Sequence, residues 1–415
     1  MNSKPRILFV IYSVLVLNIV GMAQIRKPGV FVKEISKFPP AVAEVETAIP
    51  AFIGYTEKAI SKKGDNLHSV ATKISSLPEY EQLFGRSSGL ASFVLHPSIQ
   101  LFFSNGGRSC YIVSVGGYTD NLQSSNFITG LNVISQQDEP TLLVFPDAVN
   151  LPGKELYNVQ KAALKQAAML GDRFCILDIK YADNASTHTT VIDEFRNNIG
   201  IDNLKFGAAY TPHVQVTGNG TLVLPPSAAV AAQYCSVDKE RGVWKAPANV
   251  SLNMVTDLSY SITNNEQEGL NVDAGAGKSI NAIRKFTGKG FLIWGARTLA
   301  GNDNEWRYVS VRRFFNMVEE SVKKASLSFV FEPNDANTWI RIKGMVENYL
   351  TNKWRDGALM GAKPSEAFFV KIGLGQTMTQ QDIVEGRLII EIGMAVIKPA
   401  EFIILRVSQK MGAGR

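Results

Sequence analysis

Between residues 90 and 236, short segments made up mostly of apolar residues alternate with longer amphipathic ones. Four of the apolar segments are predicted to be buried strands: 110–115, 141–145, 173–179 and 206–210. The amphipathic segments around them are predicted to be helices: 92–104, 154–170, 191–197 and 228–236. Strands that are apolar on both faces and joined by helices indicate a mostly parallel sheet covered on both sides. The sequence therefore predicts an α/β fold here, with any ligand site at the carboxyl ends of the strands.

The character of the chain changes after Arg297. Residues 306–324 and 337–353 have the apolar stripe of long amphipathic helices. Three later segments are predicted to be strands: 367–372, 387–396 and 401–407. This part of the chain is therefore predicted to be α+β.

Residues 288–315 join these two parts and carry two tryptophans and several cationic side chains. We expect Trp294 to close the core sheet and Trp306 to lie on the first long helix. Interleaved basic and aromatic residues can stack on single-stranded nucleic acid. At helical spacing, however, they favour a core-facing aromatic beside snorkelling arginines. Arg297 and Arg313 are therefore predicted to make domain contacts, with Arg297 paired rather than free.

Two short segments near the chain ends are apolar on both faces. The first lies within residues 25–36 and alternates across Val30, Phe31, Val32 and Glu34. The second lies within residues 401–407 and alternates across Phe402, Ile403, Ile404 and Leu405. A short strand at a chain end is not stable alone in water. Each segment is therefore predicted to join a sheet, either in its own chain or in a neighbour.

The length of 415 residues is typical of two or three domains. The net charge of +6 is spread along the chain, so it is explained first by solubility. The next simplest explanation is a partner protein with an acidic surface. Three widely spaced cysteines without a C-x-x-C pair predict buried thiols in a reducing compartment. Residues 1–21 conflict with that, because a basic start and an apolar run resemble a secretory signal peptide. The other interpretation is a mis-called start, with Met22 as the true first residue.

Two motifs resemble functional sites, a phosphate-binding loop and a catalytic serine, but neither has the residues that such a site requires. The segment Gly275-Ala276-Gly277-Lys278-Ser279 looks like a phosphate-binding loop, but Val272 stands where that pattern requires glycine. We expect a flexible loop there, followed by a helix at 279–286. Ser227 begins a predicted helix, but no G-x-S-x-G motif and no histidine in a catalytic-type motif accompanies it. It is predicted to be a helix N-cap.

No metal site is predicted, because the sequence has no cluster of histidine, cysteine and carboxylate ligands. The densest acidic group is assigned to helix caps and solvent-facing positions: Asp178, Asp183, Asp193 and Glu194. We expect no catalytic residue and no cofactor.

Five groups of motifs follow one another along the chain: Pro28-Gly29-Val30-Phe31-Val32 with Phe52-Ile53-Gly54; Phe103-Ser104-Asn105-Gly106-Gly107 with Cys110-Tyr111; Pro225-Pro226-Ser227-Ala228 with Arg241-Gly242-Val243-Trp244-Lys245-Ala246-Pro247-Ala248-Asn249; Ile280-Asn281 with Trp294-Gly295-Ala296-Arg297-Thr298-Leu299 and Arg312-Arg313; and Glu332-Pro333-Asn334 with Pro399-Ala400-Glu401-Phe402. Together they resemble the sheath proteins of contractile tails, both of phages and of phage-tail-like contractile injection systems. The resemblance covers nearly all of the chain after Ala23. The apolar leader before Met22 departs from the pattern, and the region between Asn105 and Thr211 is compact, as in a short sheath.

The resemblance implies a subtilisin-like α/β middle domain inserted between N- and C-terminal segments that together form the inner sheath domain. It divides the chain into a leader or mis-called start (1–21), an N-terminal arm with the first strands (22–56), the middle domain (57–296) and a C-terminal sheath domain ending in a strand arm (297–415). It also implies that the two end strands are exchanged between subunits, because an added strand ties neighbours together by main-chain hydrogen bonds. The word subtilisin-like describes a fold and not an activity.

The resemblance further implies a structural subunit that polymerises as stacked hexameric rings around an inner tube and contracts to drive the tube through a target envelope. The partners would be further copies of the chain, the tube protein, and baseplate and terminator or cap proteins, with no nucleic acid and no small-molecule substrate. Assembly is expected in the bacterial cytoplasm, as part of a free or membrane-anchored particle. Five lysines are candidates to face an acidic tube: Lys323, Lys324, Lys343, Lys353 and Lys363. The alternative is a secreted subtilisin-like α/β hydrolase that uses the leader and Ser227.

Overall fold

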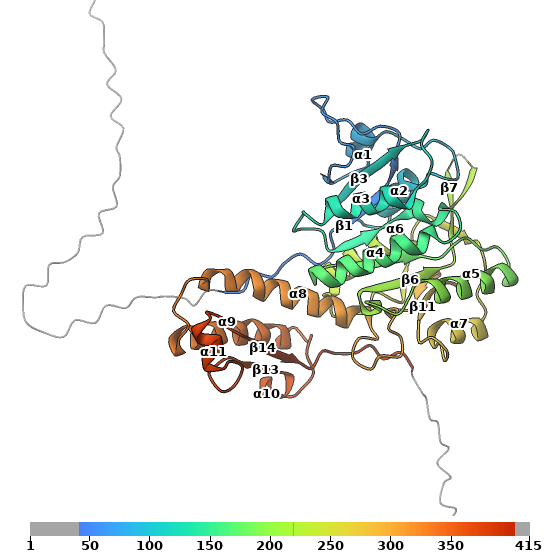
Figure 1. Cartoon of the computed structure of the whole chain (residues 1–415). Coiled ribbons are helices and arrows are strands. Elements are labelled where there is room, and N and C mark those ends of the chain that lie inside the picture. Colours follow the sequence, from blue (N-terminus) through green and yellow to red (C-terminus); the bar gives the residue numbers. More distant parts are fainter. Residues whose placement is uncertain (1–40, 219, 403–415) are drawn as a thin grey trace, which may run out of the picture. The chain divides into compact units, whose positions relative to one another are not determined.

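The computed structural model describes residues 41–218 and 220–402, and its largest element is a nine-stranded sheet (Figure 1). In order across the sheet the strands are β2 (Thr72–Ile74), β3 (Cys110–Gly117), β1 (Pro50–Thr56), β4 (Leu142–Val144), β5 (Phe174–Asp178), β6 (Gly207–Thr211), β11 (Ile280–Phe286), β12 (Gly290–Trp294) and β9 (Val250–Ser251). The six strands from β3 to β11 pair in parallel, and the strands at both edges pair antiparallel. The predicted mostly parallel sheet is therefore confirmed.

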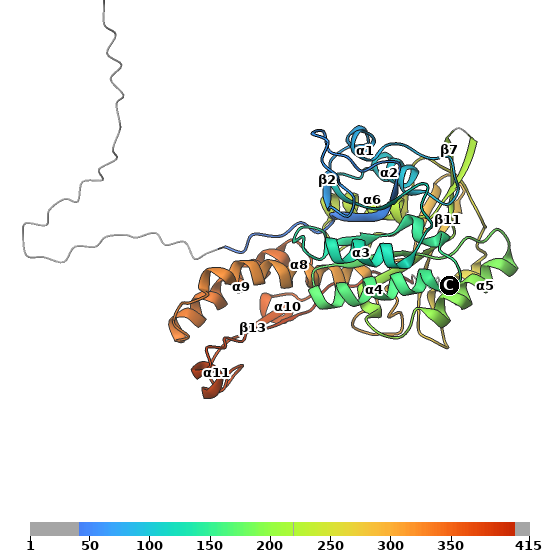
Figure 2. The same cartoon turned by 45° about the horizontal axis from the view of Figure 1, so that its top comes forward.

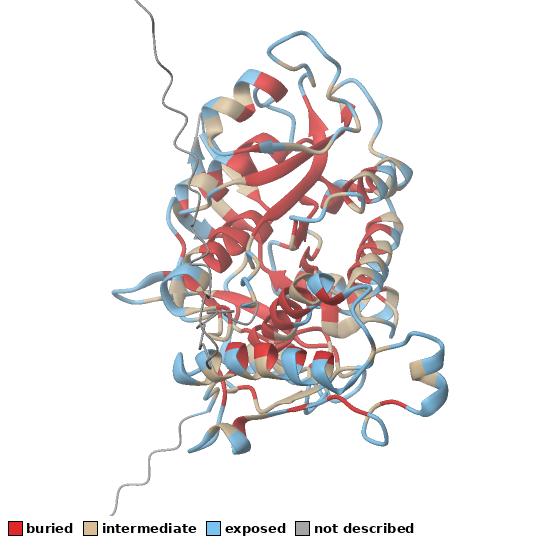
Figure 3. Cartoon of the chain, turned by 90° about the vertical axis from the view of Figure 1, so that its left-hand side faces the viewer, coloured by how far each residue is buried: buried red, intermediate tan, exposed pale blue. Residues whose placement is uncertain are grey.

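Helices cover both faces of this sheet, because its strands are apolar on both faces. The first face packs against α3 (Ser124–Ile134), α4 (Glu155–Leu170) and α5 (Ala185–Asn198). The second packs against α1 (Leu77–Phe84), α2 (Leu95–Ser104) and α6 (Ser227–Arg241). In β1, Ile53 belongs to the first core and Phe52 to the second, and both are fully buried. Figure 3 shows the buried strands between half-exposed helices. Each large apolar side chain buried in this way contributes about 1.5–3 kcal/mol.

The strand β1 lies in the interior of the sheet, between β3 and β4. It falls within the 22–56 segment that the sequence assigns to the N-terminal arm and first strands. Phe52 lies opposite Ile112 on one side and Val144 on the other. The arm therefore enters the α/β part of the chain directly through one of its inner strands.

One predicted element has the wrong type. Residues 279–286 were expected to form a helix, but residues 280–286 form β11, which pairs in parallel with β6 and antiparallel with β12. The spacing of Ile280, Ile283 and Phe286 fits a helical stripe. Ile280 and Ile283 instead enter the two opposite cores of the sheet, and pairing on both sides satisfies the backbone.

A smaller three-stranded sheet extends from the α/β part. It contains the hairpin β7 (Val214–Gly218) and β8 (Gly220–Leu224), with β10 (Val255–Leu258) paired to β7. The helix α7 (Asn264–Asn271) follows, with Thr263 as its N-cap in a capping box.

The C-terminal part has its own core between two long helices and a two-stranded sheet. The helices are α8 (Val309–Ser326) and α9 (Ala336–Arg355), and the sheet pairs β13 (Phe368–Lys371) with β14 (Glu391–Met394). Two short helices complete it, α10 (Pro364–Ala367) and α11 (Gln380–Val384). In both Figure 1 and Figure 2, α8 lies between the α/β elements and this group. The predicted α/β plus α+β composition is therefore found, and none of the described helices is both long enough and apolar enough to cross a membrane.

Candidate functional site

The carboxyl ends of β4 and β5, where a ligand site was expected, carry two buried aspartates. Asp147 lies in the 3-10 turn η1 (Pro146–Asn150) after β4, and its two carboxylate oxygens accept hydrogen bonds from the Tyr55 N–H at 2.7 Å and the Val94 N–H at 2.6 Å. Asp178 ends β5 and accepts a hydrogen bond from the Ser227 N–H at 2.9 Å. Burial raises the pKa of each aspartate to about 7, against the opposing effect of these hydrogen bonds. Both carboxylates therefore serve the first turns of α2 and α6 inside the protein.

Ser227 does not have the environment of a nucleophile. It is fully buried as the first residue of α6, and the N-cap is Pro226, so the predicted N-cap role of Ser227 is wrong. A catalytic serine must reach both its base and its substrate. In the described ranges no group of three or more histidine, cysteine and carboxylate side chains is arranged to hold a metal ion. The three cysteines are buried free thiols, as predicted.

The most elaborate polar arrangement lies where α8 meets the α/β part. The Arg313 guanidinium on α8 makes two hydrogen bonds to the Asp238 carboxylate of α6, at 3.0 and 2.5 Å, and a third to the Thr47 carbonyl at 2.8 Å. The Thr47 hydroxyl donates to the same carboxylate at 2.6 Å. The Arg313 and Asp238 side chains are 3% and 6% exposed. Burial lowers the pKa of Arg313, but the Asp238 charge outweighs that effect and the net pKa is raised.

A second buried arginine, Arg297, lies between β12 and α8. Its guanidinium binds the Glu401 carboxylate, with Nη2 2.6 Å from Oε2 and Nε 2.9 Å from Oε1. The Asn271 amide and the Tyr308 hydroxyl donate to the same carboxylate at 2.8 and 3.2 Å. Burial raises the pKa of Glu401, but these hydrogen bonds and the Arg297 charge prevail and lower it. The prediction that Arg297 is paired is therefore confirmed.

Trp306 lies just before α8, and not on it as predicted. The helix begins at Val309 because Tyr308 is extended and forms a bridge with Arg297. Two cations lie against the Trp306 ring, with the Arg312 guanidinium 4.4 Å and the Lys205 amine 4.5 Å from its centroid. Arg312 is 3% exposed and also binds Glu319. This stack joins α8 to the loop before β6 and leaves the arginine closed to a nucleic acid.

Trp294 ends β12, the second-to-last strand at that edge of the sheet, with only the two-residue β9 beyond it. Its ring packs on Phe286 at 4.5 Å and remains 37% exposed. It lines a groove of about 1290 Å³ together with Tyr308, Glu401 and Phe402. Phe402, the last described residue, is 70% exposed.

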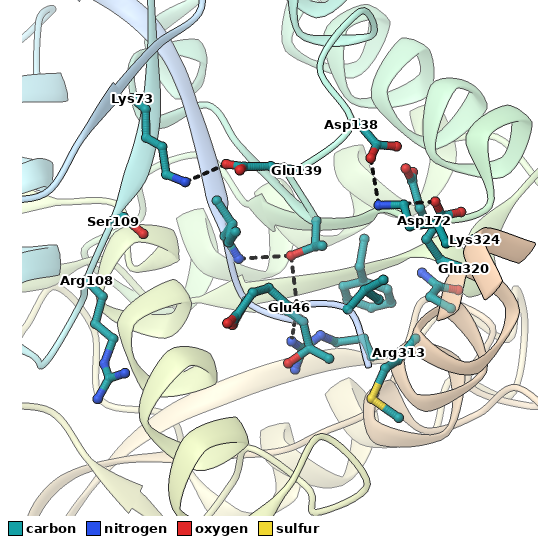
Figure 4. A pocket seen from close by; sticks show the side chains of 18 residues that line it. Glu46, Lys73, Arg108, Ser109, Asp138, Glu139, Asp172, Arg313, Glu320 and Lys324 are labelled. Carbon is teal, nitrogen blue, oxygen red and sulfur yellow. Dashed lines mark hydrogen bonds and ion pairs between the residues drawn. The ribbon is translucent and has the colours of Figure 1, made fainter. Parts of the chain in front are cut away.

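A charged cleft of about 360 Å³ lies between α8 and the α/β part (Figure 4). The chain from Val45 to Ile49 lines it, and Glu46 is labelled in the figure. Acidic and basic side chains alternate around it and pair with one another, Lys73 with Glu139 and Lys324 with Asp138. The cleft is therefore lined by the chain segment that leads into β1, and its charges are of both signs, so it does not have the character of a site for a strongly charged ligand.

In the part of the chain that the structure describes, the sheet β13–β14 has only two strands, so each strand has one edge that no further strand pairs with. In an antiparallel pair, alternate N–H and C=O groups point away from the partner strand. The Phe369 ring packs over Gly393 on one face, where any β-carbon at Gly393 would lie 2.2 Å from the ring. That face remains partly open, since Phe369 is 46% exposed.

The five candidate lysines are all paired with carboxylates of their own chain. The pairs are Lys323 with Glu320, Lys324 with Asp138 and Glu320, Lys343 with Glu347, Lys353 with Glu44 and Asp356, and Lys363 with Glu366. The Lys353 side chain is only 12% exposed, so it is the least accessible of the five. Lys323, Lys343 and Lys363 are 45–67% exposed and available to a partner.

The predicted arm strands are largely beyond the described residues. Of that set, only Phe402 falls inside them; the others lie outside: Val30, Phe31, Val32, Glu34, Ile403, Ile404 and Leu405. The sequence reasoning missed Asp238 and Glu401 as the partners of the two junction arginines. Arg313 and Glu401 each belong to the family motifs quoted above, and Asp238 lies between the two parts of the third group, which was the available signal for them.

Comparisons with known proteins agree on one family. The model of the phage tail sheath C-terminal domain matches residues 301–410. A chain in the cryo-EM structure of the anti-feeding prophage baseplate, 6-fold symmetrised, is 36% identical and superposes with a TM-score of 0.73, covering 93% of this chain and 99% of that one. A chain in the PVC sheath complex of an extracellular contractile injection system, in the contracted state, is 32% identical with a TM-score of 0.73, over 92% of this chain and 98% of that one.

A curated tail sheath protein of Vibrio phage KVP40 is 25% identical over 129 residues. That match takes in 31% of this chain and 19% of the phage protein, so it spans about a fifth of that relative's length.

Proposed function

This chain belongs to the contractile tail sheath family, and we propose that it is the sheath subunit of a phage-tail-like contractile injection apparatus. It is accordingly a structural protein and not an enzyme. The observation that carries the proposal is the 36% identity over 99% of a chain from a contractile particle's baseplate structure. Likeness over the whole length supports a short sheath without large insertions.

In this proposal residues 57–296, together with β1, form a subtilisin-like middle domain. The N-terminal arm and residues 297–415 together form the inner sheath domain. The nine-stranded sheet with helices on both faces supports the first part. The separate core of α8, α9 and β13–β14 supports the second. Val42 and Val45 pack against that core, so the N-terminal segment already contributes to it.

The arms of neighbouring subunits add strands to the sheet β13–β14. A two-stranded sheet is marginal by itself in water and gains from further strands. Its two outer edges would offer main-chain hydrogen bonds to the alternating apolar segments that contain Val30 and Phe402. Such additions tie rings of six subunits into a helical mesh, in line with the 6-fold symmetry of the related baseplate structure.

The sheath assembles extended around an inner tube and contracts when the baseplate releases it. The subunits then rotate as bodies and repack, and the free energy comes from greater burial between subunits and not from a nucleotide. The baseplate and cap proteins bind the two ends of the stack. Assembly takes place in the bacterial cytoplasm, on a particle that is free or membrane-anchored.

Deleting residues 22–36 or residues 401–407 is expected to abolish sheath tubes and leave a folded monomer. The arms supply the added strands, whereas the three cores described above are built from residues between 42 and 396. Electron microscopy of the full chain and each deletion, with circular dichroism of the monomers, is the test. Because Glu401 is bound inside the chain, a deletion of 403–407 that keeps this carboxylate is made as well, and it should also abolish the tubes. Normal tubes from either arm deletion would contradict the proposal.

Reversing the charge of Lys323, Lys343 and Lys363 together is expected to weaken binding of the sheath to its tube about tenfold or more, with a steep salt dependence. These three are the exposed members of the predicted tube-facing set. The pairs of Lys343 and Lys363 are exposed at both ends and add less than about 1 kcal/mol each to stability. Glu320, the partner of Lys323, is 8% exposed and also pairs with Lys324. Co-sedimentation of sheath with tube at several salt concentrations measures the change, and unaltered binding would remove these lysines from the tube interface.

A further inference from the structure

The two segments that lead into the arms are each held by a buried arginine, one on α8 and one on the stretch before it. Arg313 lies on α8 and holds Thr47, which precedes β1. Arg297 lies just before α8 and holds Glu401, next to the last described residue. The Val309 N–H bonds to the Ala296 carbonyl, and Arg297 pairs with Tyr308, so the stretch that carries Arg297 is fastened to the start of α8.

The N-terminal attachment extends over the segment 44–49, here called the N-root. The Val45 N–H donates to the Ser321 hydroxyl of α8 at 3.1 Å, and Glu44 pairs with Lys353 of α9. On the other side, the Thr141 hydroxyl donates to the Thr47 carbonyl at 2.8 Å and accepts the Ile49 N–H at 2.9 Å. The N-root is therefore held by the α/β part and by α8 together, before the first residue of β1.

The C-terminal attachment is concentrated on a single carboxylate. Glu401 accepts hydrogen bonds from Arg297, Asn271 and Tyr308, which come from three separate segments of the chain. Its side chain is 20% exposed, and that of Arg297 only 4%. Charge-assisted hydrogen bonds of this kind are about twice as strong as neutral ones.

We propose that Arg313 with Asp238 and Arg297 with Glu401 form two clamps that pass tension between the arms through α8. The proposal rests on the proposed function, because only a subunit whose arms are held by neighbours experiences such tension. A pull on the N-terminal arm then meets the Arg313 clamp before it reaches β1, an inner strand of the main sheet. A pull on the C-terminal arm meets the Arg297 clamp before it reaches the segment after β14. Arg313 is part of α8, and the stretch that carries Arg297 is bonded to the start of α8, so both forces act on this helix. A subunit can then transmit force from one neighbour to the next without separating the strands of a sheet.

The test compares sheaths of the full chain with those of Thr47→Val and Glu401→Gln variants. Thr47→Val removes one hydrogen bond to Asp238, and Glu401→Gln removes the charge held by Arg297, with little change in side-chain size. Glu319→Gln is the matched control, because it removes the charge that pairs with the neighbouring Arg312 and changes neither the N-root nor Glu401. Single sheaths are stretched at constant force, and amide hydrogen exchange is measured on the unassembled chains.

Both clamp variants are expected to form tubes that rupture about tenfold sooner than the full chain, which matches the loss of one charge-assisted hydrogen bond. Exchange is expected to quicken about tenfold at the Val45 and Ile49 amides in Thr47→Val, and around Ile397 in Glu401→Gln. The control should match the full chain in both measurements. Tubes that form in every variant and rupture at equal times would overturn the clamps and leave the sheath assignment intact. Failure of the full chain itself to form tubes would overturn the proposed function.

Discussion

Replacing Asp238 with alanine is expected to lower the free energy of unfolding by about 3–5 kcal/mol, the typical effect of removing one member of a buried ion pair. The Arg313 guanidinium is 3% exposed and would keep only the Thr47 carbonyl as a hydrogen-bond acceptor. The Thr47 hydroxyl would lose its acceptor as well. Chemical denaturation of the unassembled chain measures the loss.

Two further variants show whether the missing charge is the cause. Adding Arg313→Met to Asp238→Ala is expected to restore much of the stability, since a buried pair replaced by apolar groups is often neutral. Glu391→Ala removes the partner of Lys371 from an ion pair that is about half exposed and should change stability by less than about 1 kcal/mol. An Asp238→Ala variant as stable as the Glu391→Ala control would show that the pair does not hold α8 to α6.

The α/β part could be predicted because its strands are buried on both faces. Segments such as 174–177 are apolar throughout, so the strand type and the parallel sheet both follow from one pattern. The junction at 288–315 was recognisable for the same reason, because a core strand there gives way to a charged helix. The prediction of a paired Arg297 needed only the rule that a buried guanidinium requires a partner.

The rest depends on contacts between residues far apart in the chain. Asp238 is 75 positions from Arg313, and Glu401 is 104 positions from Arg297, and no periodicity relates them. The strand β11 was predicted as a helix because its apolar spacing fits either type, and its neighbours β6 and β12 decide the matter. The helix α3 escaped prediction because its polar first turn, which includes Ser124, looks like a loop.

Asp178 provides the second large effect, a dependence of stability on pH. Burial raises the pKa of its carboxyl from 3.8 to about 7 in the folded chain. The folded state therefore binds a proton that the unfolded state releases between about pH 4 and pH 7. The stability that this group contributes is fully present below about pH 4 and is lost as pH rises through 7. A rise in pKa of this size changes the free energy of unfolding by about 4 kcal/mol at most.

The Asp178→Asn variant isolates this contribution, because an amide oxygen can still accept the Ser227 N–H and the side chain no longer titrates. Unfolding free energies of both chains, measured from pH 4 to pH 8, should diverge in favour of the variant as pH rises, by a few kcal/mol. Asp147→Asn is the informative comparison. Both oxygens of Asp147 accept backbone N–H groups, so its amide must turn an NH2 towards one of them and destabilise the fold at every pH. A difference between the full chain and Asp178→Asn that stays constant from pH 4 to pH 8 would mean that Asp178 does not titrate in this range, and that its hydrogen bond from α6 outweighs its burial.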